Sequence, residues 1–411
     1  MTAMRALVAD EFSDSHIAEL HALGLDVDYD PDCAAESLES GARLGDTAIL
    51  IVRSTRVTRA AIERAPRLAL IVRAGAGFDT IDVVAASERG VLVSNCPGRN
   101  SVAVAELAMG FILALDRRIA DATTDLRAGR WNKTEYAKAE GLKGKTLGIV
   151  GLGRVGSELA KRARAFEMRV LAWSIPFRPE RAEALGVGLC ATLHDLAGVS
   201  DVVSVHLPQR VETRRLINAD VFECMKPGAI FVNTSRGGVV DDVALAEAMR
   251  HKGLRVGLDV FDPEPAEGVA VFRPALASAG VFVGTPHIGA STEQAQNAIA
   301  AETVRICAEF VKTGTVPNVV NIEEQAPAEC QLVVRHYDKV GVLASVLGVL
   351  RTHEANVEEM TNRIFRGAKT AVATIRLSKT PAPEVLADIA ALKDSVIAVE
   401  AKPLGTPPAP R

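Results

Sequence analysis

Three polar residues stand at or just after apolar runs and could act on one ligand: Arg236 in NTSRGGVVDD, Glu264 in DVFDPEP and His287 in TPHIGAST. An arginine at the end of a buried strand is costly unless an anion pairs with it. Histidine titrates near neutrality, so it can take and give a proton, and a neighbouring carboxylate fixes its tautomer. These residue types predict an acid–base pair beside an anion-binding arginine. Asp241 and Asp242 are alternative partners for Arg236, because they follow it closely in the sequence.

A glycine pattern indicates the ligand. In KTLGIVGLGRVGSELAKRARAF, Gly151, Gly153 and Gly156 form G-x-G-x-x-G after an apolar run and before a helical pattern. The first glycine permits a tight turn, the second lets the backbone approach a pyrophosphate, and the third lets helix and strand pack closely. The phosphates then lie at the helix N-terminus. The context predicts a dinucleotide-binding loop.

The three polar residues fit the chemistry of such a cofactor. Ligands of open α/β sheets bind outside the carboxyl ends of the strands. Hydride transfer between a ketone and an alcohol needs a proton donor and acceptor, which His287 can be, with Glu264 as its natural partner. A guanidinium can bind the carboxylate of a 2-oxo acid with two hydrogen bonds. We therefore expect Arg236 to hold the carboxylate end and the carbonyl oxygen of the substrate.

Ser174 departs from the usual pattern of an NAD site. An acidic residue about 20 positions after the glycines normally binds the ribose hydroxyls of NAD. Here the run MRVLAW is followed by Ser174 in AWSIPFRPER. Serine can hydrogen-bond a hydroxyl but does not repel a 2′-phosphate, and Arg178 and Arg181 follow closely. We expect NAD as the cofactor, with weaker discrimination against NADP.

The elements that must position these residues form three groups. Short apolar runs alternate with amphipathic segments over residues 1–99, which predicts a parallel sheet covered by helices. A second series of six runs over residues 146–284 predicts a doubly wound sheet. Residues 330–403 read as strand, helix, strand, strand, helix, strand, the order of the ferredoxin-like module. The fold class is therefore α/β, with two doubly wound parallel-sheet domains and a ferredoxin-like domain.

Composition excludes several classes of function. The chain has 411 residues, a net charge of -4 and no block of basic residues, so neither nucleic acid nor an anionic membrane is a predicted partner. The six cysteines are scattered without metal-ligand spacing, so no metal is predicted and the thiols are expected to be reduced. The start lacks a signal-peptide pattern, and the longest strongly apolar stretch, residues 107–115, is too short to span a membrane. We expect a cytoplasmic protein.

The motifs VGLGRVG, NTSRGGVVDD, GLDVFDPEP and TPHIGAST resemble, in order and spacing, those of the D-isomer-specific 2-hydroxyacid dehydrogenases. The resemblance covers residues 5 to about 320, and the C-terminal module looks like an ACT domain. It implies that Arg236, Glu264 and His287 are the catalytic residues. It also implies a cofactor site lined by Gly151, Gly153, Arg154, Val155, Gly156, Ser174, Thr234, Ser235, Arg236, Asp259, His287, Ile288, Gly289 and Ala290.

The resemblance also implies a division of the chain. Residues 1–99 and 288–320 would form a discontinuous substrate-binding domain, and residues 100–287 the NAD-binding Rossmann domain. Residues 321–329 would be a linker, residues 330–403 an ACT regulatory domain and residues 404–411 a disordered tail. The family further implies a homo-oligomer, a dimer or a tetramer.

Four residues of the first domain bear on the substrate: Arg53, Ser54, Arg73 and Gly75 match basic and small positions that bind phosphoglycerate in the family. The leading hypothesis is therefore NAD-dependent oxidation of 3-phospho-D-glycerate to 3-phosphooxypyruvate, the first step of L-serine biosynthesis. The alternative interpretation is that Arg53 and Arg73 are surface arginines that end strands and do not bind substrate. Another hypothesis is a hydroxypyruvate or glyoxylate reductase, which Ser174 favours. A remote one is a non-enzymatic NAD-sensing binding protein.

The C-terminal module carries a candidate effector site. RHYDKVGVL and EANVEEM match the segments in which ACT domains bind a small amino acid, and His336, Asp338 and Asn356 stand at the three contact positions. Asp338 replaces an amide with an acid that cannot donate to a carboxylate when ionised and repels it. We therefore expect weak or absent inhibition by serine. A purely structural dimerisation module is the alternative.

Overall fold

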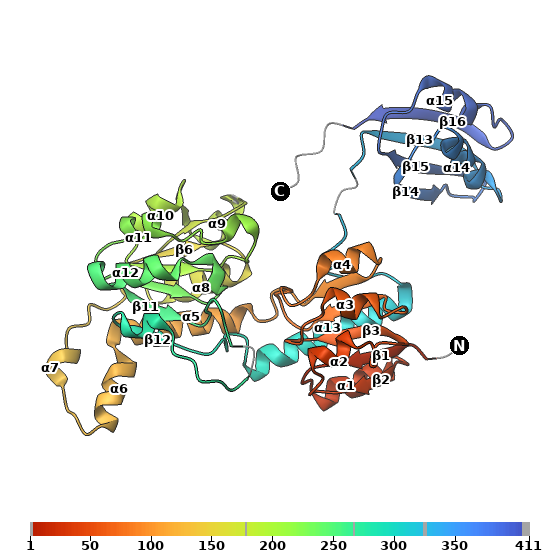
Figure 1. Ribbon diagram of the computed structural model, residues 1–411. Helices are drawn as coiled ribbons and strands as arrows, with labels where there is room; N and C mark the ends of the chain where they lie inside the picture. Colours follow the sequence, from red (N-terminus) through yellow and green to blue (C-terminus); the bar gives the residue numbers. More distant parts are fainter. Residues whose placement is uncertain (1–2, 177–178, 266–267, 324–326, 405–411) are drawn as a thin grey trace. The chain divides into compact units, whose positions relative to one another are not determined.

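The computed structural model describes residues 3–176, 179–265, 268–323 and 327–404. The chain forms two compact units, residues 1–321 and residues 322–411 (Figure 1). The first unit contains two parallel sheets and the second contains one antiparallel sheet. This arrangement confirms the fold class that the alternating apolar runs predict.

The first sheet has five parallel strands in the order β2-β1-β3-β4-β5. Its strands are β1 (Arg5–Val8), β2 (Asp26–Tyr29), β3 (Thr47–Val52), β4 (Leu70–Arg73) and β5 (Leu92–Asn95). Successive side chains enter opposite cores, because neighbours in a strand point to opposite faces. Leu7 belongs to one core and Val8 to the other. Burial on both faces explains why these strands read as continuous apolar runs.

Helices from distant parts of the sequence cover this sheet. One face carries α2 (Ala35–Glu39), α3 (Arg59–Glu63) and α4 (Val83–Glu88), and the other carries α1 (Asp14–Ala22) and α13 (Glu293–Thr313). Ile299 and Ile306 of α13 share a core with Ala6 and Leu20. Residues that follow the second sheet therefore return to complete the first.

The second sheet has seven parallel strands in the order β12-β11-β10-β9-β6-β7-β8. Its strands are β6 (Thr146–Val150), β7 (Arg169–Trp173), β8 (Gly188–Leu189), β9 (Val202–Val205), β10 (Ile230–Asn233), β11 (Arg255–Leu258) and β12 (Phe282–Gly284). The sequence analysis predicts six of them. It misses β8, because a strand of two residues has no periodicity to detect.

Two sets of helices sandwich the second sheet. One core contains α5 (Ser101–Arg117), α8 (Arg154–Ala165) and α9 (Pro179–Leu185), and the opposite core contains α10 (Leu193–Val199), α11 (Ala219–Cys224) and α12 (Asp242–Lys252). Asp241 caps α12 by accepting from the backbone N–H groups of Val243 and Ala244. Gly253 ends that helix in the left-handed conformation, with φ 68°. Three short 3-10 turns complete the unit: η1 (Val211–Thr213), η2 (Gly237–Val239) and η3 (Ala275–Ser278).

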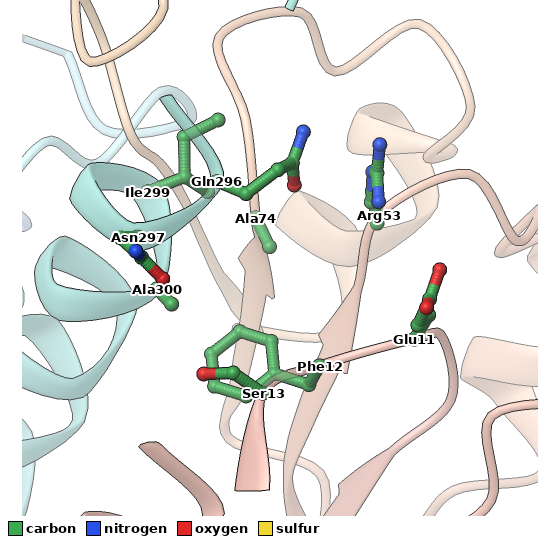
Figure 2. Close-up of a pocket in the computed structure, with 9 residues that line it drawn as sticks. All are labelled: Glu11, Phe12, Ser13, Arg53, Ala74, Gln296, Asn297, Ile299 and Ala300. Carbon is green, nitrogen blue, oxygen red and sulfur yellow. The ribbon is translucent and has the colours of Figure 1, made fainter. Parts of the chain in front are cut away.

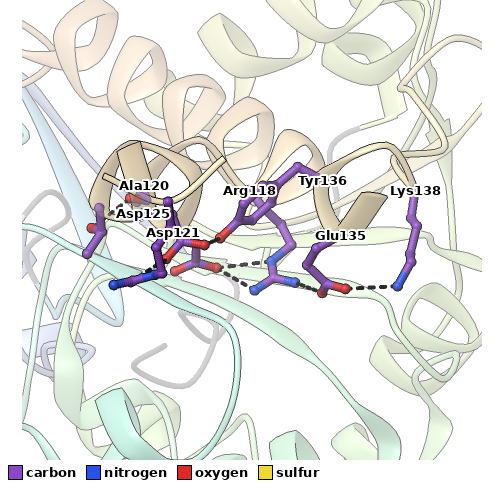
Figure 3. Close-up of polar contacts among 9 residues, drawn as sticks. Arg118, Ala120, Asp121, Asp125, Glu135, Tyr136 and Lys138 are labelled. Carbon is purple, nitrogen blue, oxygen red and sulfur yellow. Dashed lines mark hydrogen bonds and ion pairs between the residues drawn. The ribbon is translucent and has the colours of Figure 1, made fainter. Parts of the chain in front are cut away.

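Two short helices, α6 (Ile119–Arg127) and α7 (Lys133–Tyr136), form an arm that projects from the second sheet in Figure 1. None of the described residues in these two helices is buried. Figure 3 shows the polar contacts that join them. Arg118 contacts Glu135 at 2.6 Å and Asp121 at 2.9 Å, and the Tyr136 hydroxyl donates to Asp125 at 2.8 Å. These contacts hold the arm together without a core of its own.

The second unit contains a four-stranded antiparallel sheet in the order β14-β15-β13-β16. Its elements are β13 (Cys330–Tyr337), α14 (Val342–Thr352), β14 (Val357–Ile364), β15 (Thr370–Leu377), α15 (Pro383–Ala390) and β16 (Val396–Pro403). Val346 and Ile389 of the helices pack with Leu332 and Ile375 of the sheet. Of the predicted tail, residues 404–411, all but Leu404 lie outside the described residues, as do residues 324–326 of the predicted linker.

Candidate active site

His287 and Glu264 form a direct pair beyond the carboxyl ends of β11 and β12. His287 Nδ1 lies 2.8 Å from Glu264 Oε2, and Glu264 Oε1 accepts the backbone N–H of Phe261 at 3.0 Å. Burial would raise the pKa of Glu264, but the hydrogen bond and charge of His287 and the Phe261 N–H outweigh it and leave the pKa below its usual range. Glu264 is therefore a carboxylate at neutral pH. The Nε2 atom is the nitrogen of His287 that remains to face a ligand.

Asp259 holds the loop that carries His287. The sequence places Asp259 at the cofactor, yet its side chain is 1% exposed and both oxygens serve this loop. Oδ1 accepts the Thr285 hydroxyl at 2.5 Å and the N–H of Ile288 at 2.8 Å, and Oδ2 accepts the N–H of Gly289 at 2.8 Å. Burial raises the pKa of Asp259, against the effect of these donors. They secure His287 in a left-handed backbone conformation, with φ 54°.

Arg236 follows β10 and pairs with a residue of the first sheet. Its Nε donates to Asp79 Oδ2 at 2.9 Å, and its Nη1 donates to the carbonyl oxygen of Ser235 at 2.7 Å. Asp79 lies in the loop after β4. Within the described part of the chain, neither Asp241 nor Asp242 bonds to Arg236, because Asp241 is occupied as a helix cap. Both nearby alternatives raised by the sequence are therefore wrong.

Asn233 shapes the Arg236 loop, and the sequence analysis does not identify it. This residue is 1% exposed, and its Oδ1 accepts the N–H of Ser235 at 2.9 Å and the Ser235 hydroxyl at 2.7 Å. Its Nδ2 donates to the carbonyl oxygen of Arg236 at 2.9 Å. The signal was available, because asparagine at a strand end favours such local bonds to the backbone. Thr234 Oγ1, by contrast, is buried and has no partner among the described residues.

The glycine loop has the shape that a dinucleotide requires. Gly151 has φ 100°, and a Cβ there would lie 2.6 Å from the carbonyl oxygen of His206. A Cβ on Gly156 would lie 2.3 Å from the carbonyl oxygen of Gly151, whereas one on Gly153 would meet nothing within 4 Å. The first and third glycines therefore serve close packing, and the second faces open space where a pyrophosphate can approach. Together with the unpartnered Thr234 hydroxyl, this cradle fits NAD.

The structure gives the surroundings of four other residues predicted at the cofactor, Arg154, Val155, Ser174 and Ala290, whose contact with it stays a prediction. Val155 packs on the core below α8, and the Arg154 side chain lies against Gly98, whose Cβ would be 2.5 Å from Arg154 Cδ. Ser174 follows β7 directly and is half-buried. The carbonyl oxygen of Ala290 accepts from Gln296 Nε2 at 2.9 Å.

Of the two arginines that follow Ser174 closely in the sequence, only Arg181 belongs to the described residues, and there it makes no side-chain bond to Ser174. Arg181 Nε donates to Ser157 Oγ of α8 at 3.1 Å, so its guanidinium rests on that helix. Arg178 lies outside the described residues. Its proposed contact with a 2′-phosphate stays a prediction.

Arg73 forms no bond to an anionic side chain within the described ranges. Its Nε is buried and has no partner among the described residues, and its Nη1 reaches only the carbonyl oxygen of Ala74 at 3.5 Å. Burial, followed by repulsion from Arg236, lowers the pKa of Arg73 to about 10. Gly75 makes room for it, because a Cβ there would lie 1.3 Å from Arg73 Nη1. Such a group is stabilised when an anionic ligand binds.

Arg53 lines a cavity of about 210 Å³ between the first sheet and α13 (Figure 2). The cavity is lined by Glu11, Phe12, Ser13, Arg53, Ala74, Gln296, Asn297, Ile299 and Ala300. Ser54, predicted at the substrate, donates its hydroxyl to Asp10 Oδ1 at 2.6 Å, and Asp10 Oδ2 accepts the N–H of Arg53 at 2.6 Å. Asp10 thus fixes the turn that presents Arg53. The sequence analysis does not identify this role of Asp10, which stands in the sequence only as the polar residue that ends the run RALVAD.

His206 is another residue that the sequence analysis does not single out. It follows β9, where the strand order of the second sheet reverses beside β6. Its Nε2 lies 2.9 Å from Ser204 Oγ, and its buried Nδ1 has no partner among the described residues. Burial lowers the pKa of His206 to about 3, so the ring is neutral. The sequence could have pointed to His206, because this histidine stands directly after the apolar run DVVSV.

The three predicted effector residues are not joined by any side-chain bond within the described residues of the second unit. His336 is 2% exposed, and its ring nitrogens lie 2.8 Å from the carbonyl oxygen of Tyr337 and 3.1 Å from Asn362 Oδ1. Asn356 Nδ2 donates to Glu358 at 2.6 Å, while Asp338 is exposed. Both ring nitrogens of His336 therefore lie against groups of the second unit itself.

Two kinds of feature are missing from the described ranges. No helix there combines the length and the apolar character needed to cross a membrane. No group of three or more histidine, cysteine or acidic side chains in those ranges is placed to hold a metal ion.

Comparison with known proteins places the chain in a family. The model of the D-isomer specific 2-hydroxyacid dehydrogenase NAD-binding domain matches residues 109–289. A hydroxypyruvate reductase from Thermotoga maritima is 45% identical over 258 residues, which are 62% of this chain and 82% of that protein. The chain belongs to the D-isomer-specific 2-hydroxyacid dehydrogenases. The resemblance seen in the motifs and the expectation of an NAD-binding domain are therefore confirmed.

Other members of the family show how far the similarity extends. A D-3-phosphoglycerate dehydrogenase from Methanocaldococcus jannaschii is 39% identical over 321 residues, which are 78% of this chain but 60% of that enzyme. The chain thus spans about three fifths of that relative's length. The crystal structure of the TT0316 protein from Thermus thermophilus matches 77% of this chain and 100% of its own, with 35% identity and a TM-score of 0.68.

Proposed function

We propose that this 2-hydroxyacid dehydrogenase oxidises 3-phospho-D-glycerate to 3-phosphooxypyruvate with NAD, the first step of L-serine biosynthesis. The observation that carries the proposal is Arg73, whose buried Nε has no partner among the described residues and whose charge is close enough to that of Arg236 to be repelled by it. Arg53 adds a third positive charge at the same edge of the first sheet. A substrate with a carboxylate at one end and a phosphate at the other matches guanidinium groups on both sides of the reacting carbon.

The geometry of the site supports a set of catalytic roles. Arg236 binds the carboxylate and the oxygen on C2, and the Nε2 atom of His287 takes the hydroxyl proton. Glu264, held 2.8 Å from His287 Nδ1, stabilises the imidazolium that forms. NAD bound at the glycine loop supplies the hydride acceptor. In the reverse direction His287 returns the proton to the oxygen.

A reductase acting on hydroxypyruvate or glyoxylate is the second candidate. Support for it comes from the 45% identity to a hydroxypyruvate reductase and from Ser174 in place of an acid. Such substrates lack the phosphate, so Arg73 and Arg53 would contribute little to binding them. A non-enzymatic NAD-sensing protein is the third candidate, and it would keep the same fold without turnover.

A substrate screen separates these functions. Turnover is measured with 3-phosphoglycerate, glycerate, glycolate and lactate, each with NAD and with NADP, and with hydroxypyruvate and glyoxylate in the reverse direction. We expect the highest kcat/KM for 3-phosphoglycerate with NAD. A higher kcat/KM for hydroxypyruvate or glyoxylate would overturn the phosphoglycerate assignment. No turnover with any of these compounds would favour the binding protein.

We also propose the domain division and the homo-oligomer. Residues 1–99 and 288–320 would form the substrate-binding domain, residues 100–287 the NAD-binding domain and residues 330–403 the regulatory domain. The packing of α13 on the first sheet supports the discontinuous domain. On the arm, Leu126 is 58% exposed and Trp131 is 81% exposed, which favours a protein–protein contact there. Light scattering tests the oligomer, since a single species at 43.5 kDa would contradict it.

A further inference from the structure

The guanidinium of Arg236 is oriented from across the active site. Arg236 belongs to the loop after β10 of the second sheet, and Asp79 belongs to the loop after β4 of the first sheet. The ion pair between Arg236 Nε and Asp79 Oδ2 is 2.9 Å long and joins residues 157 positions apart. The side chain of Asp79 is 52% exposed and that of Arg236 is 28% exposed. An exposed pair contributes little to stability, so its value lies in orientation.

The loop after β4, which carries Asp79, also leaves space for the rest of the Arg236 guanidinium. A Cβ on Gly77 would lie 1.7 Å from Arg236 Nη2, so any larger residue would displace that nitrogen. Nη1 donates to Ser235, and Nη2 has no hydrogen-bond partner within the described ranges. A guanidinium presents its donors as a rigid planar fork. With Nε held by Asp79 and one hydrogen of Nη1 by Ser235, Nη2 and the second hydrogen of Nη1 form the edge that is left to meet a carboxylate.

Arg236 also needs a counter-charge. Its positive charge repels that of Arg73. An unrestrained Arg236 side chain would turn away from Arg73 and into solvent, because arginine has several freely rotating bonds. Asp79 offsets this repulsion while it occupies only the Nε side of the group.

We propose that Asp79 is a positioning residue for substrate binding: it holds Arg236 Nε from the opposite sheet and so aims the Nη1–Nη2 edge at the substrate carboxylate. Asp79 contacts neither substrate nor cofactor in this role. The inference rests on the proposed dehydrogenase function, because the ligand of Arg236 is the carboxylate of a 2-hydroxy acid. The contrasting possibility is that Asp79 competes with the substrate for Arg236, which predicts the opposite change in KM.

The test compares Asp79→Ala and Asp79→Asn with the wild type. We expect Asp79→Ala to raise the KM for 3-phosphoglycerate by about 10- to 100-fold, with a smaller fall in kcat. Asp79→Asn should lie between the two, because its amide oxygen can still accept from Nε. The dissociation constant of NADH, followed by its fluorescence, should stay within about twofold of the wild type, since Asp79 does not touch the glycine loop.

Asp46→Asn is the matched control. Asp46 also pairs with an arginine, Arg5, at 2.7 Å and is 60% exposed, but it precedes β3 and so lies at the opposite edge of the first sheet. Its kinetic constants should equal those of the wild type. A KM that falls in Asp79→Ala would show competition, and a KM that does not change would show that Arg236 needs no positioning. Either result would overturn the inference while leaving the dehydrogenase assignment intact.

A binding measurement keeps the two proposals separable. Oxalate, which carries two adjacent carboxylates, is titrated into the NADH complex of each variant. Weaker oxalate binding in Asp79→Ala supports positioning even if the wild type fails to oxidise any 2-hydroxy acid, in which case only the proposed function fails. Equal oxalate binding in wild type and Asp79→Ala would contradict the role of Asp79.

Discussion

At the scale of single residues, the His287–Glu264 pair carries the clearest prediction. We expect His287→Ala to lower kcat by about 10²–10⁴-fold, because the alcohol proton loses its acceptor. NADH binding should be nearly unchanged, since the glycine loop is untouched. Stopped-flow turnover and NADH fluorescence measure the two effects. His194→Ala, on the exposed side of α10, is the control, and near-wild-type turnover in His287→Ala would remove His287 from the mechanism.

Arg236 gives a parallel prediction at the same scale. Arg236→Ala should also abolish most turnover while NADH still binds, because the substrate loses its carboxylate anchor and the polarising charge beside its carbonyl oxygen. The comparison of kcat, KM and the NADH dissociation constant with those of the wild type checks this expectation. Loss of NADH binding would instead show that Arg236 chiefly supports the cofactor.

Ser174 sets the expected cofactor preference. It follows β7 directly, where an acid would bind the ribose hydroxyls and repel the phosphate of NADP. A charged hydrogen bond of about 1.5–3 kcal/mol corresponds to roughly a 10- to 150-fold change in preference. We predict that Ser174→Asp shifts the ratio of kcat/KM for NAD and NADP toward NAD. An unchanged ratio would mean that residue 174 does not face the ribose.

At the scale of elements, Glu302 joins α13 to the segment that leaves the first sheet and to the segment that follows α13. Its side chain is 4% exposed and contacts Arg99 at 2.6 Å, Arg305 at 2.6 Å and Asn318 at 2.8 Å. Arg99 lies where the chain leaves the first sheet, and Asn318 lies in the segment after α13, next to Val319, which bridges to Ser94 of β5. The hydrogen bond from Arg305, followed by those from Arg99 and Asn318, lowers the pKa of Glu302 to about 2, although burial opposes this.

The Glu302 cluster predicts a pH-dependent stability. A carboxyl with a depressed pKa stabilises the folded state above its unfolded pKa of 4.5, and this contribution disappears as the pH falls toward 2. Glu302→Gln should therefore lower stability by on the order of 3 kcal/mol at neutral pH, and the difference from the wild type should shrink below pH 4.5. Glu309→Gln, on the same helix, is the control. Denaturant unfolding at several pH values measures the difference in unfolding free energy between the wild type and Glu302→Gln. A difference that does not change with pH would contradict this account.

At the scale of the whole molecule, the C-terminal unit carries the candidate effector site. Both ring nitrogens of His336 lie against groups of its own unit. In the expected effector site, Asp338 would place a negative charge where an amide stands in relatives that bind serine. We predict weak or absent inhibition of the wild type by serine and tighter inhibition of Asp338→Asn, because the amide can donate to a carboxylate. Serine titrations of turnover compare the two forms. Strong inhibition of the wild type by micromolar serine would show that the aspartate does not repel the effector.

The sequence by itself determined the features that depend on local order. Apolar runs, turn residues and the G-x-G-x-x-G spacing encode strands, helix starts and the dinucleotide loop, because each is specified within about 20 residues. The placement of Arg236, Glu264 and His287 after strands could be predicted for the same reason.

Only the tertiary structure decided which distant groups meet. The sequence offers Asp241 and Asp242 as partners of Arg236, yet Asp79, 157 positions away, makes the contact. Asp259, which the family resemblance places at the cofactor, also accepts three hydrogen bonds from the His287 loop, and its place at the cofactor stays a prediction. Short-range patterns cannot specify such pairs, because the Arg236–Asp79 pair depends on how two sheets approach each other and the Asp259 bonds depend on two neighbouring strand ends.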